Sequence, residues 1–192
     1  MGESAIRARR WSRVEYERLI EQGVFRPGER LELLAGQLVV REPQGTPHAT
    51  AIRLVTRALL AVFRQGWSVD MQLPVALDEE SEPEPDVVVT AGEPREFLAS
   101  HPHHPVLVVE VAETSLALDR VEKGSLYARA QVPEYWIVNL NGRVLEVYRE
   151  PQPNASTPSG WAYRSCQNLT AVEHVTPSAA PGARIAVADL LP

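Results

Sequence analysis

Apolar residues recur at helical spacing in three segments of the chain. The first opens with the capping-box pattern Ser12-Arg13-Val14-Glu15 and ends near Gln22, before a glycine that can supply a left-handed cap. The second opens at Thr46-Pro47, as an N-cap followed by proline in the first turn, and continues to Gly66. The third covers residues 115–130. The spacing therefore predicts three helices.

Shorter apolar or alternating runs, bounded by turn residues, predict β-strands. Two of them, 31–34 and 37–40, flank an Ala-Gly turn and indicate a hairpin. The run 106–111 is nearly unbroken in its apolar character, which is typical of a central strand covered on both faces. With the third helix between them, this strand and a strand at 135–138 form a β-α-β unit, which predicts a parallel pair. Further strands are expected at 67–77, 86–89 and 144–148, the last after the two-residue hairpin signal Asn141-Gly142.

Strands that alternate with helices predict an α/β fold, and the chain has the length of one domain. It holds 192 residues, 44% of them apolar, which is enough to bury a core. We expect a single domain over 1–192, with a leader helix in 1–29 and a core at 30–150. Residues 151–192 are expected to form a polar linker, at 151–160, and a C-terminal extension that packs on the core.

The charge balance limits how this chain could bind nucleic acid. Its net charge is −6, whereas proteins that hold nucleic acid by charge alone usually carry a basic excess. Such a contact would need local arginines, or a metal ion that offsets the protein's own carboxylates. Eighteen of the nineteen basic residues are arginine. The single lysine, Lys123, is either a chance of composition or the mark of a site that needs a compact ammonium group.

Apolar runs and cysteine usage indicate where the protein resides. No run approaches the roughly 18 apolar residues of a membrane span, and the first residues lack the apolar stretch of a signal peptide. We therefore expect a cytoplasmic protein without membrane contact. Cys166 is the single cysteine, so it cannot form an internal disulfide and is expected to be a small packing residue.

Two acidic residues stand out because of the strands that carry them. Glu110 lies near the end of the most apolar strand, where a carboxylate is costly to bury unless a metal or a lysine neutralises it. Alternatively, Glu110 lies just past the sheet edge in water. Asp86 follows Pro85 at the start of another strand, where an Asp in a turn is the simpler interpretation. If the two strands are neighbours, the carboxylates together form a hard-oxygen site suited to Mg²⁺ or Mn²⁺.

Lys123 and Glu32 are further candidates for this site. Lys123 lies on the helix that follows the strand of Glu110, and Asp119 and Tyr127 lie one turn away on the same face. It could reach the acids and stabilise developing negative charge, or it could form a surface ion pair with Asp119. Glu32 alternates with leucines, so it is either a third acid of the site or, as the pattern alone favours, an exposed strand residue.

Other polar residues have plainer interpretations. His48 lies on the apolar stripe of its helix, which favours a core histidine over a ligand. Gln72 could orient a water or a phosphate, or it could face solvent. The histidines at 101, 103 and 104 lack the spacing of a zinc site and indicate a solvated loop. A flexible basic tail, rather than a phosphate-binding site, is the simpler interpretation of four N-terminal arginines: Arg7, Arg9, Arg10 and Arg13. No phosphate-binding loop, dinucleotide-binding motif or nucleophile elbow is present.

Several of these segments, taken in order, resemble one family. They are 32–39 (ELLAGQLV), Pro47-His48, 81–86 (SEPEPD), 108–112 (VVEVA), Asp119-Arg120, Lys123, Tyr127-Ala128 and 133–136 (PEYW). This order, which covers about Arg30 to Arg149, resembles the Uma-two family of bacterial domains in the PD-(D/E)xK nuclease superfamily. The resemblance implies a restriction-endonuclease-like α/β fold, with a mixed central sheet flanked by helices.

The resemblance also implies roles for individual residues. Asp86 and Glu110 would be the paired metal acids at strand ends. The superfamily's lysine, two residues after the second acid, is Ala112 here, so Lys123 of the following helix would supply it. Glu32 and His48 match family positions, which favours them as supporting residues.

The resulting hypothesis is a metal-dependent phosphodiesterase that acts on DNA. Asp86 and Glu110 would bind Mg²⁺ or Mn²⁺, Lys123 would position water or stabilise the phosphate, and Glu32 and His48 would support them. The alternative is a catalytically inactive nuclease-fold domain that serves as a binding or regulatory module, since fold does not fix function. Because nucleases of this superfamily often cut two strands as dimers, we also expect a homodimer.

Overall fold

The centre of the protein is a six-stranded β-sheet. The computed structural model describes residues 8–41 and 43–192. The strands lie in the order β3-β4-β5-β6-β7-β8, and the pair β5-β6 is parallel while the other neighbours are antiparallel. The sheet is therefore mixed, and the predicted α/β class and β-α-β unit are confirmed. The strand bounds are Trp67–Asp70 (β3), Val87–Ala91 (β4), Leu107–Ala112 (β5), Glu134–Asn139 (β6), Val144–Pro153 (β7) and Trp161–Thr170 (β8).

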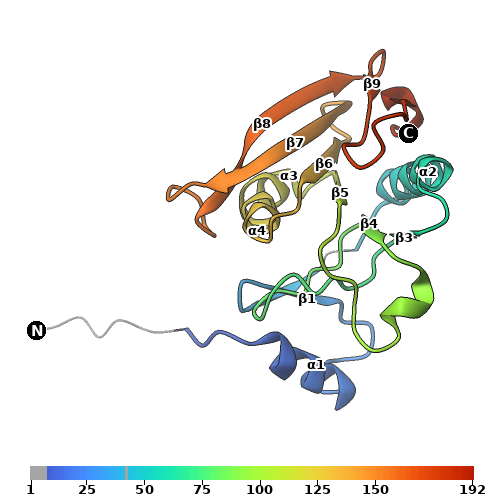
Figure 1. Cartoon of the computed structure of the whole chain (residues 1–192). Coiled ribbons are helices and arrows are strands. Elements are labelled where there is room, and N and C mark those ends of the chain that lie inside the picture. The colour runs from blue at the N-terminus through green and yellow to red at the C-terminus, as the bar shows by residue number, and fades with distance from the viewer. Residues whose placement is uncertain (1–7, 42) are drawn as a thin grey trace, which may run out of the picture.

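Helices cover both faces of this sheet, so its central strands are buried on both sides (Figure 1). One face packs against α2 (Thr46–Val62), and the core there includes Val55 and Leu59 of the helix with Val109 and Trp136 of the strands. The opposite face packs against α3 (Leu116–Leu118), the π-helical segment η2 (Asp119–Lys123) and α4 (Gly124–Arg129). Because successive side chains of a strand point to opposite faces, β5 contributes to both cores.

A smaller layer precedes the sheet in the sequence. It consists of α1 (Arg13–Glu21) and the hairpin of β1 (Leu31–Leu34) and β2 (Gln37–Val40). The predicted capping box of α1 is confirmed, with Ser12 as N-cap and Glu15 as its partner. The Tyr16 hydroxyl donates to the Leu31 carbonyl at 2.7 Å, and β1 forms a bridge to Glu82 of the loop before β4. These contacts connect the hairpin to the start of β4.

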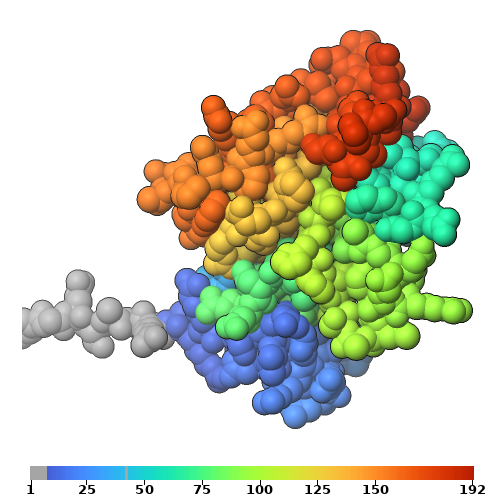
Figure 2. Space-filling view, viewed as in Figure 1, coloured from blue at the N-terminus to red at the C-terminus, as the bar shows by residue number. Residues whose placement is uncertain are grey.

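The C-terminal segment packs against α2. It contains β9 (His174–Val175), β10 (Ile185–Ala186) and the 3-10 turn η3 (Val187–Asp189), while another 3-10 turn, η1 (Pro94–Phe97), lies between β4 and β5. Leu190 and Leu191 are buried in the core of α2. Figure 2 shows the C-terminal segment, in red, against the teal surface of α2. The last apolar residues of the chain therefore pack in the core beneath α2.

Two predicted segment limits were wrong. The strand expected at 67–77 ends at Asp70, because Gln72 has a positive φ of 52° and residues 72 and 75 bond instead to the carbonyls of Pro85 and Pro83. The expected linker at 151–160 is the tip of a hairpin, since β7 continues to Pro153 and β8 begins at Trp161. Cys166 lies exposed on β8, so it is not a packing residue.

Smaller differences concern helix and turn details. Helix α2 has Gly45 as its N-cap, with Thr46 already inside the helix, and it ends at Val62, before Gly66. The turn at Asn141-Gly142 joins β6 and β7 as predicted, but four residues lie between the paired Asn139 and Val144. In the described part of the chain, no helix combines the length and apolar character needed to cross a membrane.

Candidate functional site

Asp86 and Glu110 lie on one face of the sheet, and both are buried. In the antiparallel pair β4-β5, Val87 is opposite Val109 and Val88 is opposite Val108. Continued by one residue, this register places Asp86 opposite Glu110, on the face that packs against α4. Each of the two residues is 2% exposed. The alternative in which Glu110 lies in water past the sheet edge is therefore wrong.

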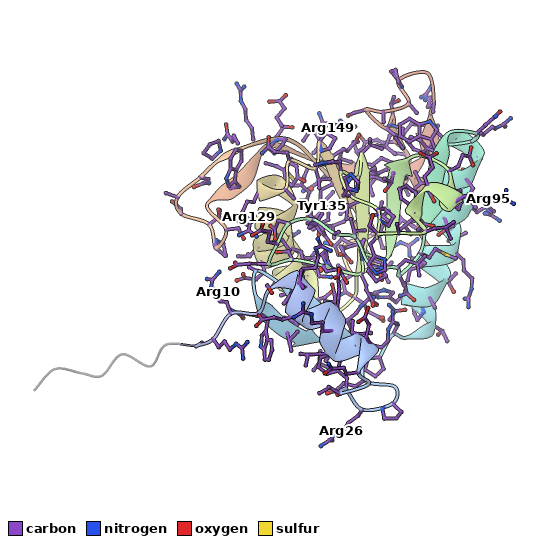
Figure 3. The ribbon with its side chains drawn as sticks, turned by 60° about the horizontal axis from the view of Figure 1, so that its bottom comes forward. Arg10, Arg26, Arg95, Arg129, Tyr135 and Arg149 are labelled. Atoms are coloured by element: carbon purple, nitrogen blue, oxygen red, sulfur yellow. The ribbon has the colours of Figure 1, made fainter. Side chains whose placement is uncertain are left out.

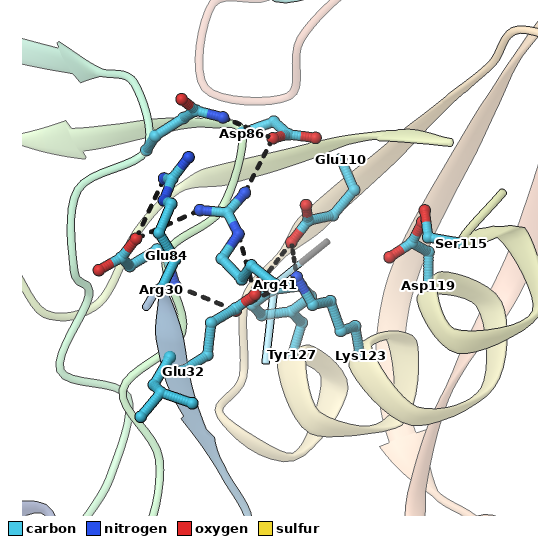
Figure 4. Close-up of polar contacts among 12 residues, drawn as sticks. Arg30, Glu32, Arg41, Glu84, Asp86, Glu110, Ser115, Asp119, Lys123 and Tyr127 are labelled. Carbon is cyan, nitrogen blue, oxygen red and sulfur yellow. Dashed lines mark hydrogen bonds and ion pairs between the residues drawn. The ribbon is translucent and has the colours of Figure 1, made fainter. Parts of the chain in front are cut away.

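Lys123 reaches Glu110 from the helical layer above that face. Its Nζ atom lies 3.0 Å from Glu110 Oε1 and 3.2 Å from Glu32 Oε2 (Figure 4). Tyr127, one helical turn later, donates its hydroxyl to the same Glu110 oxygen at 2.7 Å. The alternative surface pair with Asp119 is not formed among the described residues; Asp119 instead accepts a hydrogen bond from Ser115. Lys123 thus lies beside two buried acids, as its position on the helix allowed.

Glu32 is buried rather than exposed, which corrects the interpretation that its alternation favoured. It is 3% exposed, and its neighbours Leu33 and Leu34 are buried as well. The reason is that both faces of β1 are covered. Its carboxylate lies beside Lys123 and Arg41, and it accepts the backbone N–H of Glu84 at 3.2 Å. Glu32 is therefore a third acid of the cluster.

Asp86 is held by contacts to both of its oxygens. Oδ2 lies 3.0 Å from His48 Nε2 and accepts the backbone N–H of Val111 at 2.9 Å. Oδ1 accepts from the side-chain amides of Gln44 and Gln72, both at 3.3 Å. His48 is thus a partner of the site rather than a core histidine, and Gln72 also turns toward the site.

Arg41, like Gln44, is a site residue that the sequence interpretation missed. Its guanidinium contacts three acids through three different nitrogens: Nε lies 3.2 Å from Glu32, Nη1 3.3 Å from Glu84 and Nη2 3.1 Å from Asp86. A signal for it exists, because Val39 pairs with Glu32 across the hairpin and a residue two positions later shares that face. That signal needs the strand register, which the sequence alone does not give.

Burial and nearby charges shift the pKa values of the site in different directions. Burial raises the pKa of Glu110, although the ammonium of Lys123 favours its ionised form. For Asp86, burial also favours the neutral acid, but His48, the Val111 N–H and Arg41 outweigh it and lower the pKa. Burial raises the pKa of Asp119 to about 6 against the influence of Lys123 and Ser115. The buried acids of this layer therefore differ in how readily they ionise.

A cavity of about 340 Å³ opens onto these groups. Of the described residues that line it, five are acidic, two are arginine or lysine, and one is a histidine. Within 8–41 and 43–192, no three His, Cys, Asp or Glu side chains are grouped so that they alone could hold a metal ion. A cation here would have to complete its coordination with water. The acids are Glu32, Asp86, Glu110, Glu113 and Asp119, and the basic residues are Arg41 and Lys123.

The remaining candidates lie elsewhere. His101, His103 and His104 are exposed, as expected of a solvated loop. The N-terminal arginines 9, 10 and 13 pair with glutamates 15, 80 and 17, which makes them part of the contacts around α1 rather than a free tail. Arg7 lies outside the described residues.

The fold and the cluster together define an α/β protein with a mixed central sheet, in which two buried strand acids and a lysine lie on one face. Residues 13–188 match the Uma2 family, described as "Putative restriction endonuclease", and the chain belongs to this family. A crystal structure from Anabaena variabilis ATCC 29413, described as "a putative nuclease belonging to DUF820", has a similar fold. Its TM-score is 0.67 at 14% identity, over 92% of this chain and 95% of that one. A search among curated proteins gives no match.

Proposed function

We propose that this protein is a divalent-metal-dependent phosphodiester hydrolase that acts on DNA. The observation that carries the proposal is the burial of Asp86 and Glu110 on one face of neighbouring strands, with Lys123 3.0 Å from Glu110. Buried carboxylates are costly unless positive charge compensates them. Family membership and the nuclease description of the Anabaena structure support the same function class.

The chemistry of the donor groups fits Mg²⁺ or Mn²⁺. Both ions prefer carboxylate oxygens, and Mg²⁺ usually keeps several water ligands, which suits a site with two paired acids. Among the described residues, Oε2 of Glu110 accepts no hydrogen bond, whereas Oε1 accepts two. Among the residues that line the cavity, the acidic residues outnumber arginine and lysine by three. A phosphate would therefore meet net negative charge unless a cation were bound as well.

The protein's own residues have separable roles in this proposal. A bound cation would lower the pKa of its water ligand and polarise the phosphoryl group. Lys123 places an ammonium next to Glu110, where it can stabilise negative charge on a phosphate. Glu32 holds Lys123 in position through its ion pair. His48 and the Val111 N–H orient the Asp86 carboxylate, as residues behind metal ligands commonly do.

The surface charge agrees with a substrate held mainly at the site itself. The net charge is −6, and Arg10, Arg26 and Arg95 lie at separate edges of the molecule (Figure 3). Contacts to a DNA backbone would then be few. We expect cleavage to depend weakly on salt compared with proteins that make many phosphate contacts.

A cleavage assay tests the proposal. Plasmid and linear DNA are incubated with the pure protein and Mg²⁺ or Mn²⁺, beside the variant Asp86→Asn. A matched control is Asp189→Asn, because Asp189 is exposed on η3, outside the residues that line the cavity. The proposal expects cleavage by the parent and by the control, and its loss in Asp86→Asn. Absence of cleavage by the parent, or full cleavage by Asp86→Asn, would overturn it.

A second candidate function is a binding or regulatory module that does not turn over substrate. The observation that favours it is that Arg41 and Lys123 already pair with Glu32, Asp86 and Glu110. Titration of Mn²⁺ into the protein by calorimetry separates the two functions. Absence of heat at millimolar Mn²⁺, in the parent as in Asp86→Asn, supports the inactive module.

We propose further that the nuclease acts as a homodimer. The described residues of one copy form one cluster of this kind, and cleavage of both strands of a duplex is simplest with a second copy. Sedimentation velocity with and without duplex DNA measures the state. A monomer under both conditions would remove the dimer from the proposal while leaving the hydrolase untouched.

A further inference from the structure

Arg41 occupies an unusual position for a guanidinium. It lies directly after β2, and its side chain is 9% exposed in the wall of the acidic cavity. Figure 4 shows it between the carboxylates of Glu32, Glu84 and Asp86. A guanidinium remains charged at every physiological pH, so this positive charge can leave the acids only by movement of the side chain.

The three contacts of Arg41 divide into two groups. Nη2 is on Asp86, the acid proposed to bind a cation, at 3.1 Å. Nε and Nη1 are on Glu32 and Glu84, at 3.2 and 3.3 Å. Loss of the Asp86 contact alone would therefore leave the guanidinium paired with two acids.

A divalent cation on Asp86 would meet this guanidinium at close range. Metal–carboxylate distances are about 2.1 Å for Mg²⁺, and Nη2 lies 3.1 Å from Oδ1 of the Asp86 carboxylate. Two positive charges would then lie close together beside side chains that are 9% and 3% exposed, where Coulomb interactions are stronger than in water. The cation and Arg41 would compete for Asp86.

We infer that Arg41 is an internal competitor of the divalent cation, which neutralises Asp86 in the cation-free site and thereby sets how tightly the cation binds. The inference rests on the proposed function, because it assigns Arg41 a role at the same site. Arg41 would then act on the cation through Asp86, and its removal would change the affinity for the cation in a defined direction. A residue that only supports the fold of the site would weaken cation binding when removed, whereas a competitor would strengthen it.

Arg30 provides a matched control. Its guanidinium pairs with Glu84 at 3.3 Å, as that of Arg41 does, but it forms no ion pair with Asp86 among the described residues. It is also more exposed, with 43% of its side chain accessible. Arg30→Gln therefore removes one positive charge from the same acidic surroundings without removing the competitor.

The experiment is calorimetric titration of Mn²⁺ into the parent, Arg41→Gln, Arg41→Lys and Arg30→Gln, without DNA. Circular dichroism establishes that each variant is folded. We expect Arg41→Gln to bind Mn²⁺ about tenfold more tightly than the parent, which corresponds to about 1.4 kcal/mol. Arg41→Lys should fall between them, since one ammonium cannot bridge three acids, and Arg30→Gln should stay within about twofold of the parent.

Each outcome bears on the inference separately from the proposed function. Equal or weaker Mn²⁺ binding by Arg41→Gln, with clear binding by the parent, overturns the competitor and leaves the metal site intact. Mn²⁺ binding by Arg41→Gln but not by the parent supports the competitor strongly. Absence of binding by every variant overturns both. If Arg41→Gln does not fold, tighter binding by Arg41→Lys than by the parent supports the inference, and weaker or equal binding overturns it.

Discussion

The ammonium of Lys123 lies 3.0 Å from Oε1 of Glu110, and neither side chain has appreciable access to solvent. Burial alone would lower the pKa of Lys123, but the charges of Glu110 and Glu32 raise it above its ordinary value. The lysine is therefore held charged inside the protein by the same acids that we propose as part of the metal site. Stability and function should be coupled at this pair.

Replacement of Lys123 by methionine should destabilise the protein strongly. The substitution keeps most of the side-chain volume but leaves Glu32 and Glu110 without their ammonium partner, which typically costs about 3 to 5 kcal/mol. Urea unfolding measures the loss. The matched control is Arg164→Met, because Arg164 forms an exposed pair with Glu150 at 3.6 Å and should cost less than about 1 kcal/mol. Similar losses in both variants would contradict a buried, compensating lysine.

Replacement of His48 by alanine should weaken Mn²⁺ binding with little effect on the fold. His48 orients Asp86 through the 3.0 Å contact of Nε2 with Oδ2, and loss of such a partner commonly costs about 10- to 100-fold in metal affinity. His101→Ala is the control, since His101 is exposed and lies outside the cavity lining. Calorimetric titration of Mn²⁺ measures both variants. Unchanged affinity in His48→Ala would remove His48 from the site.

The acid pair could be inferred from the sequence because each acid interrupts or opens an apolar strand. Strand periodicity then requires only that the two strands be neighbours for Asp86 and Glu110 to meet. The position of Lys123 could be inferred for a similar reason, because the helix of a β-α-β unit packs back over the sheet. These inferences depend on the regular geometry of strands and of the β-α-β unit, which the spacing of apolar residues predicts well.

The surroundings of the pair could not be inferred in the same way. The alternation of residues in β1 indicates one apolar face of the strand. Glu32 lies on the other face, which is buried because segments distant in the sequence cover it. Arg41 becomes a candidate only when the pairing of Val39 with Glu32 is known. The π-helical turn at Asp119–Lys123 leaves no mark in apolar spacing, although it carries two buried charged residues.

Of two adjacent leucines in α2, only the buried one should lower the stability of the protein when it is replaced by alanine. Leu59 is 0% exposed and packs in the main core, whereas Leu60 is 53% exposed. Leu59→Ala should cost about 2 to 5 kcal/mol, because it removes buried methyl groups and leaves a cavity. Leu60→Ala, the control, should stay within about 0.5 kcal/mol of the parent. Equal effects in urea unfolding would mean that α2 does not bury the face assigned to it.

Glu82 should make the stability of the protein depend on pH. Burial, followed by the nearby carboxylate of Glu17, raises the pKa of Glu82 to about 7 despite Arg13, and its Oε2 atom has no hydrogen-bond partner among the described residues. Its ordinary pKa is 4.5. The folded state therefore binds more protons than the unfolded state between these values, so the contribution of Glu82 is fully present below about pH 4.5 and is lost as the pH rises through 7.

Glu82→Gln removes this titration while keeping a neutral side chain of the same size. Relative to the parent, the variant should gain stability between pH 5 and pH 8, by about 2 to 3 kcal/mol, because one pKa unit corresponds to about 1.4 kcal/mol. The difference between the two proteins is the quantity to measure, since other buried acids titrate in both and cancel. Urea unfolding at several pH values gives it. A difference that is independent of pH would mean that Glu82 is ionised in the folded protein throughout, with Arg13, 4.0 Å away, as an adequate counter-charge.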